Sequence, residues 1–534
     1  MAETATVEVD EAGLGGTKLN RAKPYQLVMF PFNNGATNVY YVLLMNYIAY
    51  YANGVLGLLV AFATTMVTVT RIFDAVIDPV IGMFIDRTET KIGKFRPFII
   101  MGNVVMAVSA VVLFYGTRLI PADMEAVRYV AYTLCYMCLM VGYAMQTSCT
   151  RSAQTCLTND PKQRPTFTMF NTVASLLGMG VTMATASVVG GQVGFGTEEF
   201  FNFLIPLVII LSGALTAVAV IGIAGKDRKE FWGFGGEAEK TELKVKDYVG
   251  IVKGNKELQR LMIAASGTKF AFAVATNTTV GVLLYACMMG DYNQFYLPMY
   301  VMGYVFSVPF FLGGLRISQK SGQKRTLVTF TSVALLCYVG VVVLLGLWNP
   351  GDPAFGLSLF SLDGGFHLTL NAYTLLFIVL YGLGYGAYYS TADMAIPMVA
   401  DVSDYEMFRS GNYAPGVVGT LFSFVDKLVS SLSTTVVGLA ITFVGLSTLP
   451  DTDTPYMAGM NVLTIVLFCV IPIIAWILTL VAMKGYKLTG ARMKEIQAVN
   501  ACRKDAIAEG MSVEKALETW KDIEDVPERY IDAS

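Results

Sequence analysis

Charged residues are scarce in this sequence, and histidine is almost absent. Asp, Glu, Lys and Arg together make up 15% of the 534 residues, and there is 1 histidine. Hydrophobic residues make up 54%, and the mean hydropathy of +0.56 is far above that of an ordinary soluble domain. A chain of this composition is expected to be an integral membrane protein.

Several functional classes are excluded by what the sequence lacks. The net charge of -2, without a clustered basic surface, leaves no footprint for a nucleic-acid partner. No nucleophile-and-base motif, metal-ligand cluster or glycine-rich phosphate loop is present, so neither an enzyme nor a cofactor is expected. The 8 cysteines are scattered, and the CxxC of Cys135 and Cys138 has no companion pair, so these thiols are expected to fill packing space.

Long apolar stretches follow one another along the chain. Each is sufficient for the roughly 20 residues that a helix needs to cross a bilayer, and short polar loops separate them. Twelve transmembrane helices are predicted, at residues 28–52, 55–84, 97–117, 126–149, 167–191, 202–224, 259–288, 295–316, 326–347, 369–393, 417–446 and 457–483.

Lysine and arginine are unevenly distributed between the loops. The loops after even-numbered predicted helices carry them, whereas the loops 348–366 and 447–456 contain none. Because short basic loops stay cytoplasmic, both termini are predicted to lie in the cytoplasm. Residues 1–24 lack an apolar core followed by a cleavage site, so they are expected to form a cytoplasmic arm and not a signal peptide. The expected location is a cell membrane, such as the bacterial inner membrane.

The longest polar interruption before the tail follows the sixth predicted helix and divides the helices into two sets of six. This is the organisation of the major facilitator fold. The predicted fold class is therefore an all-α membrane protein built from two six-helix halves. Its expected parts are an N-terminal arm, an N-terminal half, a central cytoplasmic loop, a C-terminal half and a cytoplasmic tail, at 1–24, 25–225, 226–258, 259–483 and 484–534.

An internal echo supports the two halves. Glycine and basic residues recur at the same topological place, from Gly82 to Arg96 after the second predicted helix and from Gly314 to Arg325 after the eighth. Four clustered cationic side chains next to helix ends could pair with carboxylates and with the carbonyl ends of neighbouring helices, and so hold one face of the protein shut. In the tail, Ser512 is expected to cap an amphipathic helix. The expected gating residues are Asp86, Arg87, Lys94 and Arg96.

Ionisable residues inside predicted membrane helices are costly to place, so each is a functional candidate. Asp74 and Asp78 are four residues apart, which puts both carboxylates on one helical face, with Arg71 one turn before them. Two close carboxylates can share a proton or surround a hard cation such as Na⁺. An ion-pair network with Arg71 that only holds helices together is the alternative. The coupling-ion site is favoured, because apolar residues could fill a purely structural role at lower cost.

Further intramembrane candidates are Arg151, Lys269, Asp393, Asp426 and Lys427. Lys269 lies deep and beside a threonine, which indicates a hydrophilic helix face. Arg151 and Asp393 lie near helix ends and could snorkel to the membrane surface. Asp426 and Lys427 are adjacent, so at most one of them squarely lines a central cavity.

The segment RIFDAVIDPVIGMFIDRTETKIGKFRPF, residues 71–98, closely resembles the helix-two signature of the glycoside-pentoside-hexuronide:cation symporters. The melibiose permeases are the best-known members of that family. The resemblance continues through 157–165, 398–428 and 486–497, so it spans essentially the whole membrane domain.

This resemblance implies roles for individual residues. It implies a sugar-like substrate midway between the halves and a coupling cation, Na⁺ or H⁺, on the carboxylates that match Asp74 and Asp78. Lys427 matches a lysine beside the sugar and cation sites, and Arg71 matches the arginine of helix two. The expected substrate-binding residues are Asn38, Arg71, Thr147, Arg151, Thr172, Ser423 and Lys427.

The sugar site departs from that of the melibiose permeases. Asn38 and Thr147 stand where those proteins have acidic sugar ligands, which argues against a galactoside such as melibiose. Thr172 aligns with an arginine of that subgroup, and Arg151 aligns with its aromatic platform. Because a guanidinium binds planar carboxylates bidentately, an anionic glycoside such as a hexuronide is the substrate hypothesis.

The coupling ion and the function class keep alternatives. Ile77 and Ala144 stand where the family has side chains with neutral oxygen atoms. With fewer such oxygens to bind Na⁺, H⁺ is favoured as the coupling ion, and both ions stay open. The predicted function is cation-coupled import of a sugar-like solute by alternating access, by a monomer surrounded by membrane lipids. A transporter of lysolipids or other amphiphiles, and a membrane sensor that signals through the tail, are the other hypotheses.

Overall fold

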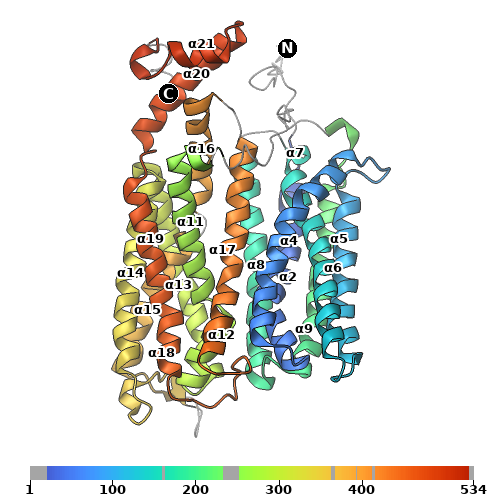
Figure 1. Cartoon of the computed structure of the whole chain (residues 1–534), viewed down its shortest axis with the longest axis vertical. Coiled ribbons are helices and arrows are strands. Elements are labelled where there is room, and N and C mark those ends of the chain that lie inside the picture. Colours follow the sequence, from blue (N-terminus) through green and yellow to red (C-terminus); the bar gives the residue numbers. More distant parts are fainter. Residues whose placement is uncertain are drawn as a thin grey trace, which may run out of the picture. The chain divides into compact units, whose positions relative to one another are not determined.

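The structure is a computed structural model of the chain, and its described residues are mostly helical (Figure 1). Two compact units are present. Unit 1 comprises Met1–Leu58 and Ile72–Thr241, and unit 2 comprises Leu59–Arg71 and Glu242–Ser534. The long helix α4 (Val60–Arg87) is shared between them. The structure describes residues 21–158, 163–231, 250, 252–361, 367–391, 394–411 and 415–527.

Among the described residues, 10 helical segments are long and apolar enough to cross a membrane. An eleventh is counted if Lys256–Ala275 and Thr278–Met288 form one span with a bend of 46°. The first predicted helix corresponds to a run of shorter helical segments, because π-helical turns interrupt it: α2 (Phe32–Val42), η1 (Leu43–Tyr47), α3 (Ile48–Tyr50) and η2 (Tyr51–Val55). The count of twelve and the cytoplasmic position of both termini stay predictions.

Close helix contacts in unit 1 depend on small residues. Gly35 of α2 and Gly178 of α8 lie against each other's helix, and a Cβ added at either would meet backbone atoms of the neighbour. Apolar residues around Phe30, Phe95 and Phe167 form a core at one end of the unit. The other helices of unit 1 are α1 (Pro24–Met29), α5 (Arg96–Val111), α6 (Glu125–Ser152), α7 (Gln154–Leu157), α8 (Gln163–Val193) and α9 (Glu198–Ile223).

Unit 2 contains a broken helix. α11 (Lys256–Ala275) ends one turn before α12 (Thr278–Val282), and the Asn277 side chain caps α12 by accepting a hydrogen bond from the Thr279 N–H. The first part of α4 packs in this unit, where Thr68 Oγ1 donates to the Ser431 carbonyl at 3.0 Å. The other α-helices described in this unit before the tail are α13 (Tyr292–Ser321), α14 (Gln323–Leu347), α15 (Ala372–Thr391), α16 (Ala395–Ser410), α17 (Pro415–Phe443), α18 (Met460–Ile465) and α19 (Ile471–Gly485).

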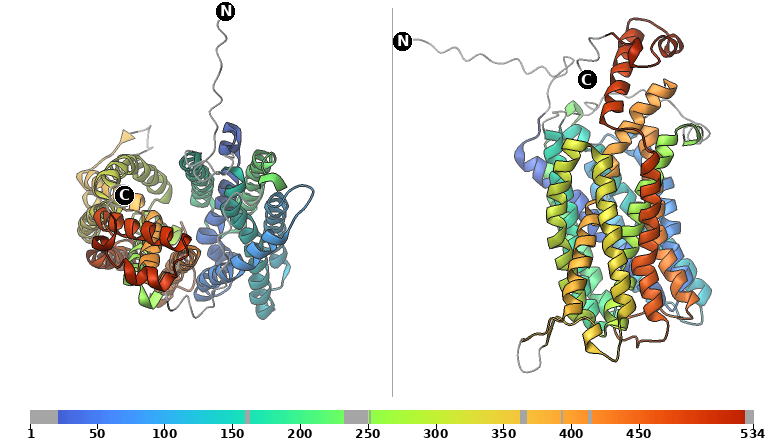
Figure 2. Two further views of the ribbon diagram at one scale, coloured as in Figure 1. Left: turned by 90° about the horizontal axis from the view of Figure 1, so that it is seen from above. Right: turned by 90° about the vertical axis from the view of Figure 1, so that its left-hand side faces the viewer.

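The tail helices of unit 2, α20 (Gly490–Ala508) and α21 (Val513–Thr519), lie at the end of the unit where α16 lies (Figure 2). Arg503 is only 5% exposed, and its guanidinium donates to the carbonyls of Phe408 and Trp520. It also lies 5.0 Å from the ring centroid of Phe408. Asn500 adds a hydrogen bond of 2.9 Å to the Asp404 carbonyl of α16. The tail is therefore a docked part of unit 2.

A short antiparallel pairing joins β1 (Phe360–Ser361) to β2 (His367–Leu368) in the connection between α14 and α15. His367, the single histidine, is exposed there.

Candidate functional site

The two carboxylates predicted to bind the coupling cation lie on the part of α4 that belongs to unit 1. Asp74 is fully buried at 0% exposure, and Asp78 is partly exposed. α4 continues without interruption past Pro79, so positions four apart share a face. A carboxylate at this depth of a candidate span is stable only when its charge is neutralised. The pair can do this chemically by holding a proton or a small cation.

The predicted substrate residues of unit 1 come from three helices. Asn38 on α2 donates its amide to the Asn34 carbonyl at 2.8 Å, and Asn34 donates to the Asn171 carbonyl of α8 at 3.3 Å. Thr147 is partly buried on α6, and Thr172 is exposed on α8. The Arg151 side chain lies outside the described residues.

A buried polar network beside these residues was not predicted. Gln146 of α6 donates its amide to Asn33 of α2 at 2.9 Å and to Thr216 of α9 at 2.8 Å. Asn33 donates in turn to Thr150 at 2.7 Å. The available signal was that Asn33, Gln146 and Thr216 are polar residues within predicted apolar helices. Only the fold shows that they meet. The network fixes three helices of unit 1 around the predicted substrate residues.

The predicted substrate residues of unit 2 lie on α4 and α17. Arg71 is 5% exposed, whereas Ser423 and Lys427 are partly exposed and lie one turn apart on α17. Thr68 and Thr435 hold these two helices together through their hydroxyls, which are 2.8 Å apart. Asp393 lies outside the described residues.

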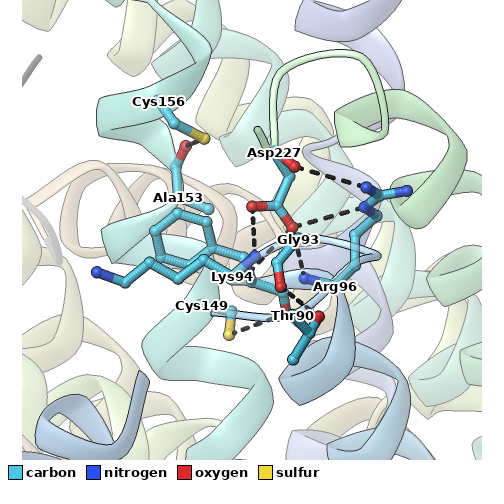
Figure 3. Close-up of polar contacts among 9 residues, drawn as sticks. Thr90, Gly93, Lys94, Arg96, Cys149, Ala153, Cys156 and Asp227 are labelled. Atoms are coloured by element: carbon cyan, nitrogen blue, oxygen red, sulfur yellow. Dashed lines mark hydrogen bonds and ion pairs between the residues drawn. The ribbon is translucent and has the colours of Figure 1, made fainter. Parts of the chain in front are cut away.

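The turn between α4 and α5 is clamped by a residue that sequence reasoning missed (Figure 3). The Asp227 carboxylate, which follows α9, accepts hydrogen bonds from the backbone N–H groups of Lys94, Phe95 and Arg96 at 2.8, 3.0 and 2.9 Å. These donors are the N–H groups of the first residue of α5 and of the two residues before it, at the positive end of the helix, which favours an anion. Gly93, with φ +124°, passes so close to Asp227 that a side chain would collide.

The predicted gating residues do not act as one set in this unit. Arg96 lies 3.5 Å from the Asp227 carboxylate, so its guanidinium contributes to the clamp. Lys94 places its ammonium 6.0 Å from the Phe95 ring centroid, and Arg87 is exposed. The Asp86 side chain lies outside the described residues. Their predicted part in gating stays a prediction.

A thiol beside the clamp is chemically quiet. The Cys156 Sγ donates to the Ala153 carbonyl at 3.1 Å in the region shown in Figure 3. Burial and the nearby charge of Asp227 raise the pKa of Cys156 to about 12, so the thiol stays protonated.

In unit 2, the turn between α13 and α14 corresponds to the turn between α4 and α5, and different contacts hold it. α13 and α14 are separated by Gly322 alone, with φ +82°. Lys324 donates its ammonium to the carbonyl of Tyr486 at 2.6 Å. Tyr486 directly follows α19. In both units, therefore, the residue that ties down this turn comes from just after the unit's last long membrane helix.

Asp401→Asn is expected to change how stability depends on pH. Burial and the charge of Asp404 raise the pKa of Asp401 on α16 to about 6. Because the pKa of Asp401 is higher in the folded protein than in the unfolded chain, the protonated side chain contributes to folding stability. This contribution to stability is fully present below about pH 4 and is lost as pH rises through 6. The loss is about 1 kcal/mol after allowing for solvent screening.

Thermal unfolding of the detergent-solubilised protein between pH 4 and 7 measures this effect. Asp401→Asn should flatten the fall in melting temperature over that range, whereas Asp123→Asn, in an exposed loop, should leave it unchanged. An unaltered slope in Asp401→Asn would show that another group titrates.

Comparison with known proteins defines the class to which the fold and site belong. A family model described as MFS/sugar transport protein matches residues 30–490. The chain therefore belongs to this family of sugar transporters of the major facilitator type, which confirms the resemblance to the glycoside-pentoside-hexuronide:cation symporters.

Curated relatives are bacterial transporters. YagG of Escherichia coli (strain K12), provisionally named a glycoside/cation symporter, is 26% identical over 470 residues, which cover 84% of this chain and 88% of YagG. The lactose permease of Leuconostoc lactis is 24% identical over 80% of this chain and 64% of that permease. YjmB of Bacillus subtilis (strain 168), named an uncharacterized symporter, is 25% identical over 75% of this chain and 79% of YjmB.

Solved structures share the fold. The xylose transporter XylE from E. coli, in a partially occluded inward-open conformation, matches with a TM-score of 0.53 and 10% identity over 85% of this chain and 96% of that structure. The nucleoside transporter NupG matches with a TM-score of 0.51 and 13% identity over 87% of this chain and 100% of that structure. The predicted all-α major facilitator fold and the multi-pass membrane location are confirmed.

Proposed function

We propose that this protein imports a glycoside by cation-coupled symport, with Asp74 and Asp78 as the site of the coupling ion. The burial of Asp74 at 0% exposure inside a candidate membrane span carries the proposal, because a carboxylate there needs a neutralising partner. The names of the relatives, a glycoside/cation symporter and lactose permeases among them, support a sugar-like substrate.

The coupling ion is H⁺ or Na⁺, and its binding raises substrate affinity through Arg71 and Lys427. The two halves alternate in opening the central site to each side of the membrane. Arg151 favours an anionic glycoside such as a hexuronide, because its guanidinium matches a planar carboxylate. The termini and the basic turns face the cytoplasm.

Uptake by proteoliposomes tests the proposal. Labelled neutral glycosides, pentosides, hexuronides and sulfonated sugars are offered with a Na⁺ gradient or a H⁺ gradient imposed separately. One class should accumulate above its external concentration under one gradient, and an ionophore for that ion should abolish the accumulation. Accumulation of none would reject symport of sugars and favour an amphiphile transporter or a sensor. Uptake of neutral sugars alone, unchanged by Arg151→Gln, would reject the hexuronide.

A further inference from the structure

Five aromatic side chains of unit 2 form a continuous cluster that no predicted site includes. Tyr300, Tyr304 and Phe311 come from α13, Phe272 from α11 and Tyr389 from α15. We call these five residues the aromatic cluster. The spacing of four and seven residues places the three α13 rings on one stripe of that helix.

The rings of the aromatic cluster are in mutual contact. The Tyr304 ring centroid lies 4.9 Å from that of Tyr300 and 5.2 Å from that of Tyr389, both nearly edge to face. The Tyr389 centroid lies 5.5 Å from that of Phe272 and 5.7 Å from that of Phe311. These separations are those of favourable aromatic pairs, so the cluster is a pre-formed apolar surface.

Three phenol oxygens line one edge of this surface. The hydroxyls of Tyr300 and Tyr304 are 2.9 Å apart, and the hydroxyl of Tyr389 donates to that of Tyr304 at 3.5 Å. Tyr300, Tyr304 and Tyr389 are partly exposed, and Phe311 is 45% exposed. The neighbouring Tyr385 is buried and serves the core. The aromatic cluster is therefore the accessible border of a larger aromatic core.

The depth of the aromatic cluster argues against lipid as its partner. Tyr304 lies 12 residues into the candidate span that begins at Tyr292, which is about 18 Å along the helix. Tyrosines that serve as lipid anchors sit at the membrane surface, where their hydroxyls reach water. Tyr300 and Tyr304 both lie well inside this span, where a hydroxyl that faced hydrocarbon would have no water. A solute with both an apolar face and oxygen atoms satisfies the rings and the hydroxyls together.

We infer that the aromatic cluster binds the aglycone of the transported glycoside and that this aglycone is an aryl group. The inference rests on the proposed function. An aryl ring gains stacking and edge contacts with the five rings and demands no hydrogen bonds of its own. A second sugar in this place would bring several hydroxyls to a surface that offers three phenol oxygens, too few to satisfy all of them, at the cost of lost hydration. The phenol edge suits the single glycosidic oxygen of an aryl glycoside.

Competition between matched glycosides tests the inference. The methyl and phenyl glycosides of the sugar identified by the uptake panel compete with the labelled substrate, and the ratio of their inhibition constants is measured. The wild-type protein should bind the phenyl glycoside about tenfold more tightly. Tyr304→Leu, Tyr389→Leu and Phe311→Leu should bring the ratio close to one and leave the methyl glycoside within about twofold of the wild-type value.

Controls separate the rings from other effects. Tyr304→Phe and Tyr389→Phe keep the rings and should keep the phenyl preference. Phe443→Leu changes a ring that is 93% exposed at the end of α17, and it should alter neither constant. The exposed Phe311 supplies a variant that folds even if the tyrosine variants do not.

Several outcomes would overturn the inference: no phenyl preference in a wild-type protein that transports glycosides, a preference that survives all three leucine variants, or equal weakening of both glycosides. A wild-type protein that takes up no glycoside would overturn the proposed function itself, and the inference with it.

Discussion

Asp74→Asn and Asp78→Asn are each expected to abolish gradient-driven accumulation of the substrate while sparing much of its downhill exchange. The asparagine amide can neither take up the transported proton nor supply the negative charge that holds Na⁺. A bound coupling ion raises the affinity for the substrate, by about tenfold or more for a typical coupling energy. Without the ion, this gain in substrate affinity is lost. Proteoliposomes measure both activities in one preparation, with a gradient imposed or with substrate on both sides.

Asp123→Asn is the matched control, because it removes a carboxylate from an exposed loop between two candidate spans. It should retain full accumulation. Full concentrative uptake by either α4 variant would remove that carboxylate from the coupling site. Equal loss of accumulation and exchange would instead favour the ion-pair network with Arg71, because a damaged helix arrangement would impair both activities.

Asp227→Asn is expected to destabilise unit 1 by about 3 kcal/mol, the cost of leaving buried donors without their charged acceptor. Asp227 is 1% exposed and accepts from three backbone N–H groups at the start of α5. An asparagine offers one acceptor oxygen, and its NH2 group, which is itself a donor, would face backbone N–H donors. The melting temperature in detergent should fall by roughly 5 °C or more.

Glu89→Gln tests whether the loss of any negative charge at the turn between α4 and α5 would destabilise unit 1 as much as Asp227→Asn. Glu89 pairs with Lys229 beside the clamp, but both side chains are more than half exposed, at 54% and 74%. This variant should cost less than about 0.5 kcal/mol. Equal destabilisation by the two substitutions would mean that Asp227 acts through the general charge of the turn and not through the backbone of α5.

The sequence was sufficient for properties that depend on neighbouring residues. The apolar length of each span and the spacing of Asp74 and Asp78 are local, so the membrane class and the shared helix face follow from the order of the residues. The signature at 71–98 likewise placed the chain in a family that comparison confirms. The π-helical turns of the first predicted helix left no such local mark, because small shifts of backbone hydrogen bonds produce them.

The order of the residues by itself determined that this is a helical membrane transporter and where its costly carboxylates lie. Tertiary structure alone decided which distant residues meet. Asp227 and Lys94 are 133 residues apart, and the meeting of Phe272, Tyr304 and Tyr389 joins three helices. In the sequence, Asp227 was one more polar residue at the edge of a loop, and the aromatic residues were ordinary apolar helix positions. Their roles come from burial and from partners, which only the packing of the helices supplies.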